Sequence, residues 1–160
     1  MAEWSMAVVL KTTKVQAFGG SNPSPSARFF YVRLALLMLA TCDLIAFVST
    51  TNPVGARRFY GDTLGLPMID QTPVACVFQA NRTMLRVTTA ERVIPAPYTV
   101  LGWAVTDIAA TILALRERGV RFLRFDGLDQ DDLGLWRAPS GGQIAWFTDA
   151  DGNMLSLTQF

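Results

Sequence analysis

Apolar runs alternate with short turn-forming segments from residue 43 to the end of the chain. The segment DLIAFVSTTNP (43–53) begins with such a run, which predicts a strand, and it ends at Asn52-Pro53. Asn52 is suited to cap a helix and Pro53 to occupy its first turn. The next segment, VGARRFYGDTLG, carries apolar and aromatic residues at helical spacing and ends at Gly65. We therefore expect a strand followed by a helix.

The second half of the chain has the same order of segments. TVLGWAVTD (99–107) predicts another strand, and its last residue, Asp107, is suited to cap a helix. The helix predicted for IAATILALRERG places Ile108, Ile112 and Leu115 on one face and ends at Gly119. In both halves the helix leads to a strand, a turn and two further strands. The sequence thus predicts two βαβββ modules.

Each module closes on the same hairpin pattern. ANRTMLRVT (80–88) and ADGNMLSLT (150–158) align without a gap and share the first alanine, the Met-Leu pair and the last threonine. The two copies differ at the position after Met-Leu, where the first has Arg86 and the second has Ser156. The duplication predicts that these two residues occupy equivalent places in the two modules.

The middle of the second module is longer. Within FDGLDQDDLGLWRAPSGG (125–142) we expect a strand over residues 133–137 between two loops, and its four aspartates are typical of a solvated loop. DADGN (149–153) resembles the opening of a calcium-binding loop. That loop requires a bidentate Glu at its twelfth position, where this chain has Phe160. A hairpin turn is therefore expected at 149–153.

The N-terminal segment leaves three interpretations open. ARFFYVRLALLMLATCD (27–43) places two arginines before an apolar run, as a signal peptide does, but the uncharged run is about half of the roughly 20 residues that a spanning helix needs. A secretory signal is one alternative. The interpretation that we favour is that translation begins at Met38. We expect residues 1–42 to be an N-terminal extension, of which residues 1–37 would precede the true start, and the protein to be cytoplasmic.

Composition removes several classes of function. The 160 residues carry a net charge of +1, so no strong field attracts nucleic acid or an anionic membrane. Cys42 and Cys76 form neither a disulfide framework nor a zinc motif, and we expect both to be small apolar residues. The chain has no histidine, which excludes every mechanism that depends on one.

Three motifs in order, ARRFYGDTLGL, VTDIAATILALRERGVRF and TDADGNMLSLTQF, resemble the vicinal oxygen chelate (VOC) superfamily of glyoxalases, bleomycin resistance proteins and extradiol dioxygenases. The resemblance covers residues 43–160. It implies an α+β fold in which module 43–92 and module 98–160 form a paired half-barrel. It also implies that the two sheets face one another across a ligand cavity, and that the protein is a homodimer.

The resemblance also locates the metal ligands of the metal-dependent members. They would fall on Ile45 and Val100, seven residues before each helix cap, and on Arg86 and Ser156 in the closing strands. None of these is a competent ligand for a divalent ion, so we expect no metal and no cofactor. A shift of register would bring Gln79, Gln143 or Glu91 into play, but several strands would have to shift together.

Alternation along the strands predicts which residues face the cavity. The candidate ligand-binding residues form a mostly apolar set with one charge: Ile45, Phe47, Met84, Arg86, Val100, Gly102, Met154, Ser156 and Thr158. Arg86 would orient an anionic or carbonyl group. The alternative for Arg86 is that it bends outward at the sheet edge or forms an ion pair with a carboxylate such as Glu91. Trp103, Trp136 and Trp146 are expected to be packing residues, Trp103 on the helix-facing side.

Two classes of function follow. The first is a metal-free binding protein for a small, partly apolar molecule with an anionic or carbonyl group. The second is a metal-dependent lyase, isomerase or dioxygenase with unconventional ligands, so whether the protein is an enzyme stays open. A third alternative is a scaffold whose apolar faces serve only dimerisation.

Overall fold

The structure is a computed structural model and describes residues 39–160. Residues 43–160 form one unit, and Leu39–Thr41, a single exposed 3-10 turn (η1), belongs to a separate one. The proposed start at Met38 lies outside the described residues, and the cytoplasmic location stays a prediction. No helix within residues 39–160 combines the length and the apolar character needed to cross a bilayer.

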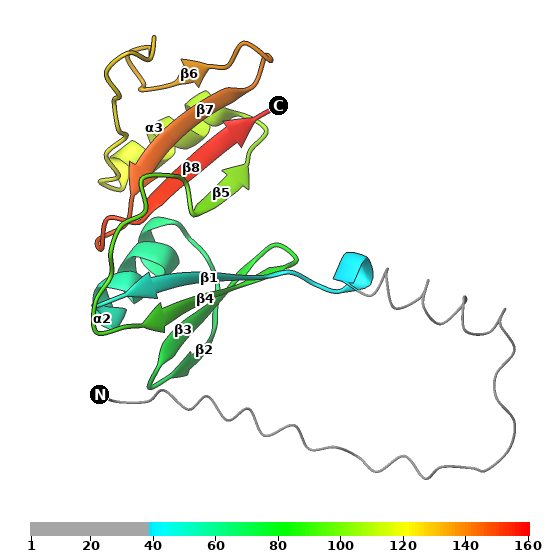
Figure 1. The fold of residues 1–160 in the computed structure, drawn as a ribbon, viewed down its shortest axis with the longest axis vertical. Coiled ribbons are helices and arrows are strands. Elements are labelled where there is room, and N and C mark those ends of the chain that lie inside the picture. The colour runs from blue at the N-terminus through cyan, green and yellow to red at the C-terminus, as the bar shows by residue number, and fades with distance from the viewer. Residues whose placement is uncertain (1–38) are drawn as a thin grey trace, which may run out of the picture. The chain divides into compact units, whose positions relative to one another are not determined.

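The first module contains a four-stranded sheet in the order β1-β4-β3-β2 (Figure 1). β1 and β4 run parallel, and the other neighbouring strands run antiparallel. The elements of this module are β1 (Ile45–Thr50), α2 (Pro53–Ala56), η2 (Arg57–Thr63), β2 (Met68–Thr72), β3 (Ala75–Ala80) and β4 (Thr83–Thr89).

The helix of this module begins and ends at the predicted residues. Asn52 Oδ1 accepts a hydrogen bond from the Gly55 amide at 2.9 Å, and Pro53 is the first helical residue. After Ala56 the helix widens into a π-helical segment, η2, in which the Leu64 amide donates to the Phe59 carbonyl at 2.8 Å. It ends before Gly65, whose φ of +76° is the left-handed conformation that glycine adopts at low cost.

The second module repeats this arrangement with the strand order β5-β8-β7-β6 (Figure 1). Its elements are β5 (Leu101–Ala104), α3 (Ile108–Glu117), β6 (Trp136–Arg137), β7 (Gln143–Thr148) and β8 (Met154–Gln159). Asp107 caps α3 by accepting from the Ala110 amide at 2.9 Å, and Ile108 and Ile112 are buried. The prediction of two βαβββ modules is confirmed.

The strand expected over residues 133–137 was predicted too long, because only Trp136–Arg137 pairs with β7. The Asp131 carboxylate accepts hydrogen bonds from the amides of Leu133 and Leu135 at 2.9 and 3.0 Å, which holds this stretch in a turn. Gly134 has a φ of +79°, which is incompatible with a strand.

The helix-facing sides of the two sheets share one core. Fifteen buried side chains form a single hydrophobic cluster that draws on both modules. The Phe59 ring of the first module lies 6.4 Å from the Phe147 ring of the second, centroid to centroid. Cys76 is part of this core, as expected, whereas Cys42 is exposed. The two modules therefore stabilise each other by burying apolar surface against one another.

The turn at 149–153 joins the modules by hydrogen bonds. As predicted, it connects two antiparallel strands, β7 and β8. The Asp151 carboxylate accepts hydrogen bonds from both the hydroxyl and the amide of Thr51, at 2.6 and 2.9 Å, and from the Thr50 hydroxyl. Burial raises the pKa of Asp151, but these hydrogen bonds outweigh that effect and hold its pKa below the ordinary value.

A second contact between the modules is buried. The Tyr60 hydroxyl donates a hydrogen bond to Asp149 Oδ2 at 2.8 Å. Burial raises the pKa of Tyr60, and the negative charge of Asp149 raises it further, so the phenol stays protonated and acts as the donor. The polar turn is thus tied to η2 in the first module.

Candidate functional site

One face of each sheet points away from the shared core. In β1, Ile45, Phe47 and Ser49 alternate with buried Val48 and Thr50, and the side chain of Phe47 is 62% exposed. This side of the first sheet is called face A. Met84 and Arg86 of β4 also lie on it, because they pair directly with Ile45 and Phe47.

Arg86 occupies the centre of face A. It is paired with Phe47 on one side and with Val77 on the other. Within residues 39–160 its guanidinium makes no hydrogen bond and no ion pair; in particular, it does not pair with Glu91. A half-buried guanidinium keeps its strong preference for an anion or a carbonyl oxygen, so these five donors can serve a ligand.

The corresponding side of the second sheet, face B, is centred on Ser156. Gly102 and Trp146 pair with Ser156 on its two sides. Ser156 is only 6% exposed, and its hydroxyl makes no hydrogen bond to another described residue. The hydroxyl leans over Gly102, because a Cβ added there would lie 2.7 Å from Ser156 Oγ. Gly102 therefore makes room for this hydroxyl.

The other candidate residues of the second module surround this pair. Met154 and Thr158 share the parity of Ser156 in β8, and both are half-buried. Val100 precedes β5, is 37% exposed and donates its amide to the Met154 carbonyl at 2.9 Å. The structure thus groups the nine predicted residues in two sets, four on face A and five on or beside face B.

A cavity of about 370 Å³ lies between the first module and strand β5. Gly102 is the candidate residue that lines it. Trp103 and Arg82 line it as well, and the remaining walls come from Leu44, Ala46, Ala80, Asn81, Thr83, Leu85, Leu101 and Ala104. Gly102 and Ala104 of face B line this cavity, whereas Arg86 and Ser156 are not among its lining residues.

Two tryptophans that the sequence predicts to be packing residues, Trp136 and Trp146, lie on face B. Trp103 is part of the shared core, as predicted. Trp146 is the direct strand neighbour of Ser156, and Trp136 pairs with Ile144 on the same face. The hairpin turn at 149–153 contained the signal, since a turn centred on residue 151 pairs residue 146 with residue 156.

The four positions that the sequence motifs assign to metal ligands carry no suitable set of donors. Within residues 39–160, no three His, Cys, Asp or Glu side chains are grouped closely enough to hold an ion. Gln79 lies on face A, but its amide nitrogen donates to the Asn81 carbonyl at 2.6 Å, inside its own hairpin. The residues at the four positions, Ile45, Arg86, Val100 and Ser156, do not fit a divalent cation.

Comparison with known proteins decides the family. The model of the Glyoxalase/Bleomycin resistance protein/Dioxygenase superfamily matches residues 43–157. The chain belongs to this superfamily. No curated protein matches it.

Solved structures of this superfamily have the same fold. A member from Sphaerobacter thermophilus is 22% identical, with a TM-score of 0.59, over 75% of this chain and 98% of that one. A bleomycin-binding protein complexed with bleomycin is 18% identical, with a TM-score of 0.60, over 75% and 99%. Lactoylglutathione lyase from Agrobacterium tumefaciens is 18% identical, with a TM-score of 0.55, over 74% and 93%. The paired half-barrel predicted from the motifs is therefore confirmed.

Proposed function

We propose that this superfamily member binds a small, partly apolar molecule with an anionic or carbonyl group, without using a metal. The observation that supports the proposal is the state of Arg86 and Ser156. At equivalent places in the two closing strands, both polar groups lie on largely apolar faces, and neither has a hydrogen-bond partner within residues 39–160. Polar groups in such surroundings are normally paired, so a ligand that pairs them gains free energy.

Arg86 is the group that contributes most to affinity. A guanidinium donates two parallel hydrogen bonds to a carboxylate, and such charge-assisted bonds are stronger than neutral ones. Phe47 and Val77 beside it reduce the contact of the ion pair with water, which strengthens the attraction. Ser156 contributes one hydrogen bond from the other face.

We propose further that a second copy of the chain completes the site. Ile45 and Phe47 are apolar side chains that are 46% and 62% exposed on face A. Face B presents small residues, Gly102 and Ala104, at the corresponding strand. Exposed apolar side chains are often covered by a partner, so we expect a homodimer in which face A of one copy lies opposite face B of its partner and the ligand lies between the two faces.

Light scattering of the purified protein tests the dimer. We expect twice the mass of one chain, and we expect Phe47→Asp to give the mass of one chain because it places a charge in the contact. Val54→Asp is the matched control, since Val54 is 64% exposed at the start of α2, away from face A. A wild-type protein that is monomeric at every concentration tested would contradict the proposed dimer.

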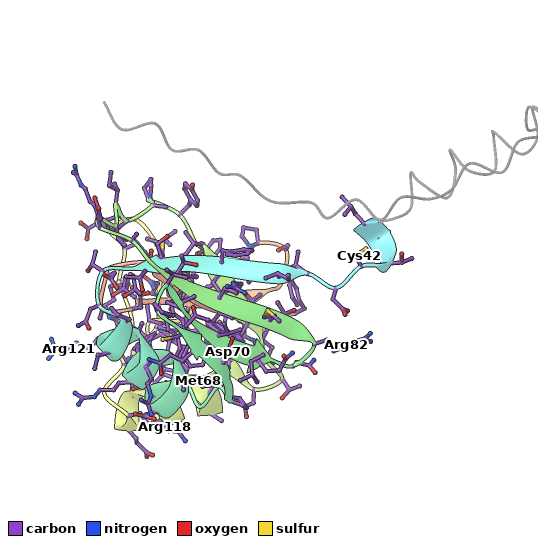
Figure 2. All side chains as sticks on the ribbon, turned by 90° about the horizontal axis from the view of Figure 1, so that it is seen from below. Cys42, Met68, Asp70, Arg82, Arg118 and Arg121 are labelled. Carbon is purple, nitrogen blue, oxygen red and sulfur yellow. The ribbon has the colours of Figure 1, made fainter. Side chains whose placement is uncertain are left out.

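Titration calorimetry with a carboxylate library tests the binding function. Arg86→Met keeps most of the side-chain length and removes the charge, so it should leave the fold intact and weaken binding by about 2 kcal/mol or more. The control is Arg82→Met at the turn between β3 and β4, where the arginine points away from the sheet (Figure 2). Equal affinities of wild type and Arg86→Met for every hit would rule out the role of Arg86.

The alternative is a metal-dependent lyase, isomerase or dioxygenase with unconventional ligands. Elemental analysis separates the two functions, because the proposed binding protein holds less than a tenth of an equivalent of zinc, iron, manganese or nickel. Thermal denaturation with added metal is the second measurement, since an ion that binds the folded state raises the melting temperature. One bound equivalent, or a large rise with metal, would favour the enzyme.

A further inference from the structure

Face B combines a floor of small side chains with a wall of large ones. Gly102 and Ala104 of β5 and Ser156 and Thr158 of β8 form the floor. On the neighbouring strands, Trp146 pairs with Ser156, and the row through Thr158 continues with Ile144 and Trp136 (Figure 1 shows the strand order). The wall consists of three large side chains on β7 and β6: Ile144, Trp146 and Trp136. The large side chains of the wall therefore stand beside small ones, which leaves the side of the wall open to a flat group.

The aromatic rings of the wall are held in position from several sides. The ring centroids of Trp136 and Trp146 are 6.0 Å apart with their planes tilted by 35°, and the Phe125 ring meets Trp146 edge-on at 5.4 Å. The indole nitrogen of Trp146 donates a hydrogen bond to Thr99 Oγ1 at 3.2 Å. The indole is therefore fixed at its polar edge before any ligand binds.

The loop that carries Phe125 is fixed as well. Gln130 Oε1 accepts a hydrogen bond from the Phe125 amide at 2.7 Å, and its Nε2 donates to the carbonyls of Leu123 and Gly134 at 3.1 and 2.7 Å. One amide side chain thus holds both ends of the loop. A binding surface that is ordered beforehand loses less entropy when a ligand binds.

The rings of Trp136 and Trp146 are not fully buried in the core. Phe147, next to Trp146 in β7, points to the other side of the sheet and is fully buried, whereas Trp146 and Trp136 are both half-buried. Some aromatic surface therefore stays accessible beside the unpaired hydroxyl of Ser156. Aromatic rings attract other rings beyond the effect of buried area, because their charge distributions favour offset or edge contacts.

We propose that face B binds a flat aromatic ring, which packs against the indole of Trp146 while a polar substituent on the ring hydrogen-bonds to Ser156 Oγ. This inference rests on the proposed binding function, because it names the chemical class of ligand for the Ser156 half of the same site. The short side chain of Ser156 leaves room for the ring beside Trp146, and Trp136 limits it on the side of β6.

The test compares two uncharged probes without a carbonyl, 2-naphthol and its saturated counterpart decahydro-2-naphthol. The pair matches in carbon skeleton and hydroxyl and differs in aromaticity. We expect 2-naphthol to bind about fivefold or more tightly in calorimetric titration. We also expect upfield ring-current shifts of its protons in NMR spectra of the wild-type complex. Equal affinities, or an absence of such shifts, would overturn the proposal.

Substitutions of single tryptophans test whether the wall residues bind the aromatic probe. Trp146→Leu should weaken 2-naphthol binding about tenfold, whereas Trp103→Leu should not, because Trp103 lies on the core side of the same sheet. Circular dichroism checks that each variant folds. If Trp146→Leu does not fold, Trp136→Leu replaces it, since β6 is a two-residue edge strand. A folded wall variant with unchanged affinity would overturn the proposal.

A third probe separates this inference from the proposed function. Cyclohexanecarboxylate has a charge but no aromatic ring, so its binding should depend on Arg86 and not on Trp146. If its affinity falls in Arg86→Met while 2-naphthol fails to bind wild type, the aromatic inference is wrong and the proposed function stands. If 2-naphthol behaves as expected and cyclohexanecarboxylate is insensitive to Arg86→Met, the role of Arg86 is wrong and the inference stands.

Discussion

The two modules share one buried pair of side chains and differ in the row on the opposite side of the same strands. Phe78 pairs with Leu85 in the first sheet, and Phe147 pairs with Leu155 in the second; all four are at most 1% exposed. On the other side of the same strands, the row Phe47–Arg86–Val77 corresponds to the row Gly102–Ser156–Trp146. Large and small residues have exchanged places between the two rows.

The physical reason for this difference is packing. Close packing fixes the volume at a fully buried pair such as Phe78 and Leu85, and the second half repeats this pair as Phe147 and Leu155. A position on the side of the sheet away from the shared core is less constrained, and its residue can differ in size and charge without changing the backbone. The contrast indicates that faces A and B are the places where the two halves can take different roles in ligand binding.

The largest effect is expected from substitutions in the buried pair that the two modules share. Phe147→Ala and Phe78→Ala should each lower the free energy of unfolding by about 3–5 kcal/mol, because each removes a fully buried ring. Since Phe59 packs on Phe147 across the modules, we expect one cooperative transition in urea for both variants.

The control for these variants is Leu113→Ala on α3, whose side chain is 51% exposed and whose loss should change stability by less than about 0.5 kcal/mol. Two separate transitions in Phe78→Ala, with the second sheet still folded after the first step, would contradict a shared core.

The sequence predicted most of the fold for identifiable reasons. Helix starts were found because Asn52 and Asp107 accept hydrogen bonds from amides three residues later, an interaction that is local in the chain. Strand parity was predictable in strands such as β1, where buried and exposed residues alternate. The strand over residues 133–137 was too long because hydrogen bonds of Asp131 compete with sheet pairing, which composition does not indicate.

The candidate site was predicted in part. The duplicated hairpin located Arg86 and Ser156, but the sequence could not show that the faces carrying them lie on the outside of a shared core. That arrangement depends on long-range contacts such as Tyr60 with Asp149. The wall of aromatic rings was missed because its tryptophans were judged by residue type and not by their strand partners.

The two hairpin turns offer the next test of the comparison. The turn between β3 and β4 is formed by Asn81 and Arg82, whereas the turn between β7 and β8 carries Asp151, which binds the first module. Asp151→Asn should lower the free energy of unfolding by about 1–2 kcal/mol at pH 7, because a neutral amide accepts weaker hydrogen bonds and accepts them at one atom only.

This contribution depends on pH in a defined direction. The pKa of Asp151 is lowered in the folded state, so its stabilisation is complete above the ordinary carboxyl pKa and is lost as the pH falls through the folded value. Urea denaturation of wild type and Asp151→Asn at pH 7 and below pH 3 measures the difference. Arg82→Met, in the other turn, should leave stability unchanged at both values. A difference between wild type and Asp151→Asn that persists at low pH would contradict the assignment to the carboxylate.

The smallest expected effect tests the difference between the rows on faces A and B directly. Face A holds a full side chain at Phe47 beside Arg86, but face B cannot hold even a methyl group at the equivalent Gly102, because that Cβ would lie 2.7 Å from Ser156 Oγ. Gly102→Ala should force the serine into another rotamer and lower the free energy of unfolding by about 0.5–1 kcal/mol. Ser156→Ala in the same chain removes the clashing oxygen, so the double variant should regain that loss. Gly142→Ala is the control, since its Cβ would meet nothing closer than the Gln159 carbonyl at 3.7 Å. Urea denaturation of the four proteins in a double-mutant cycle measures the coupling, and additive effects would show that Ser156 does not occupy the space above Gly102.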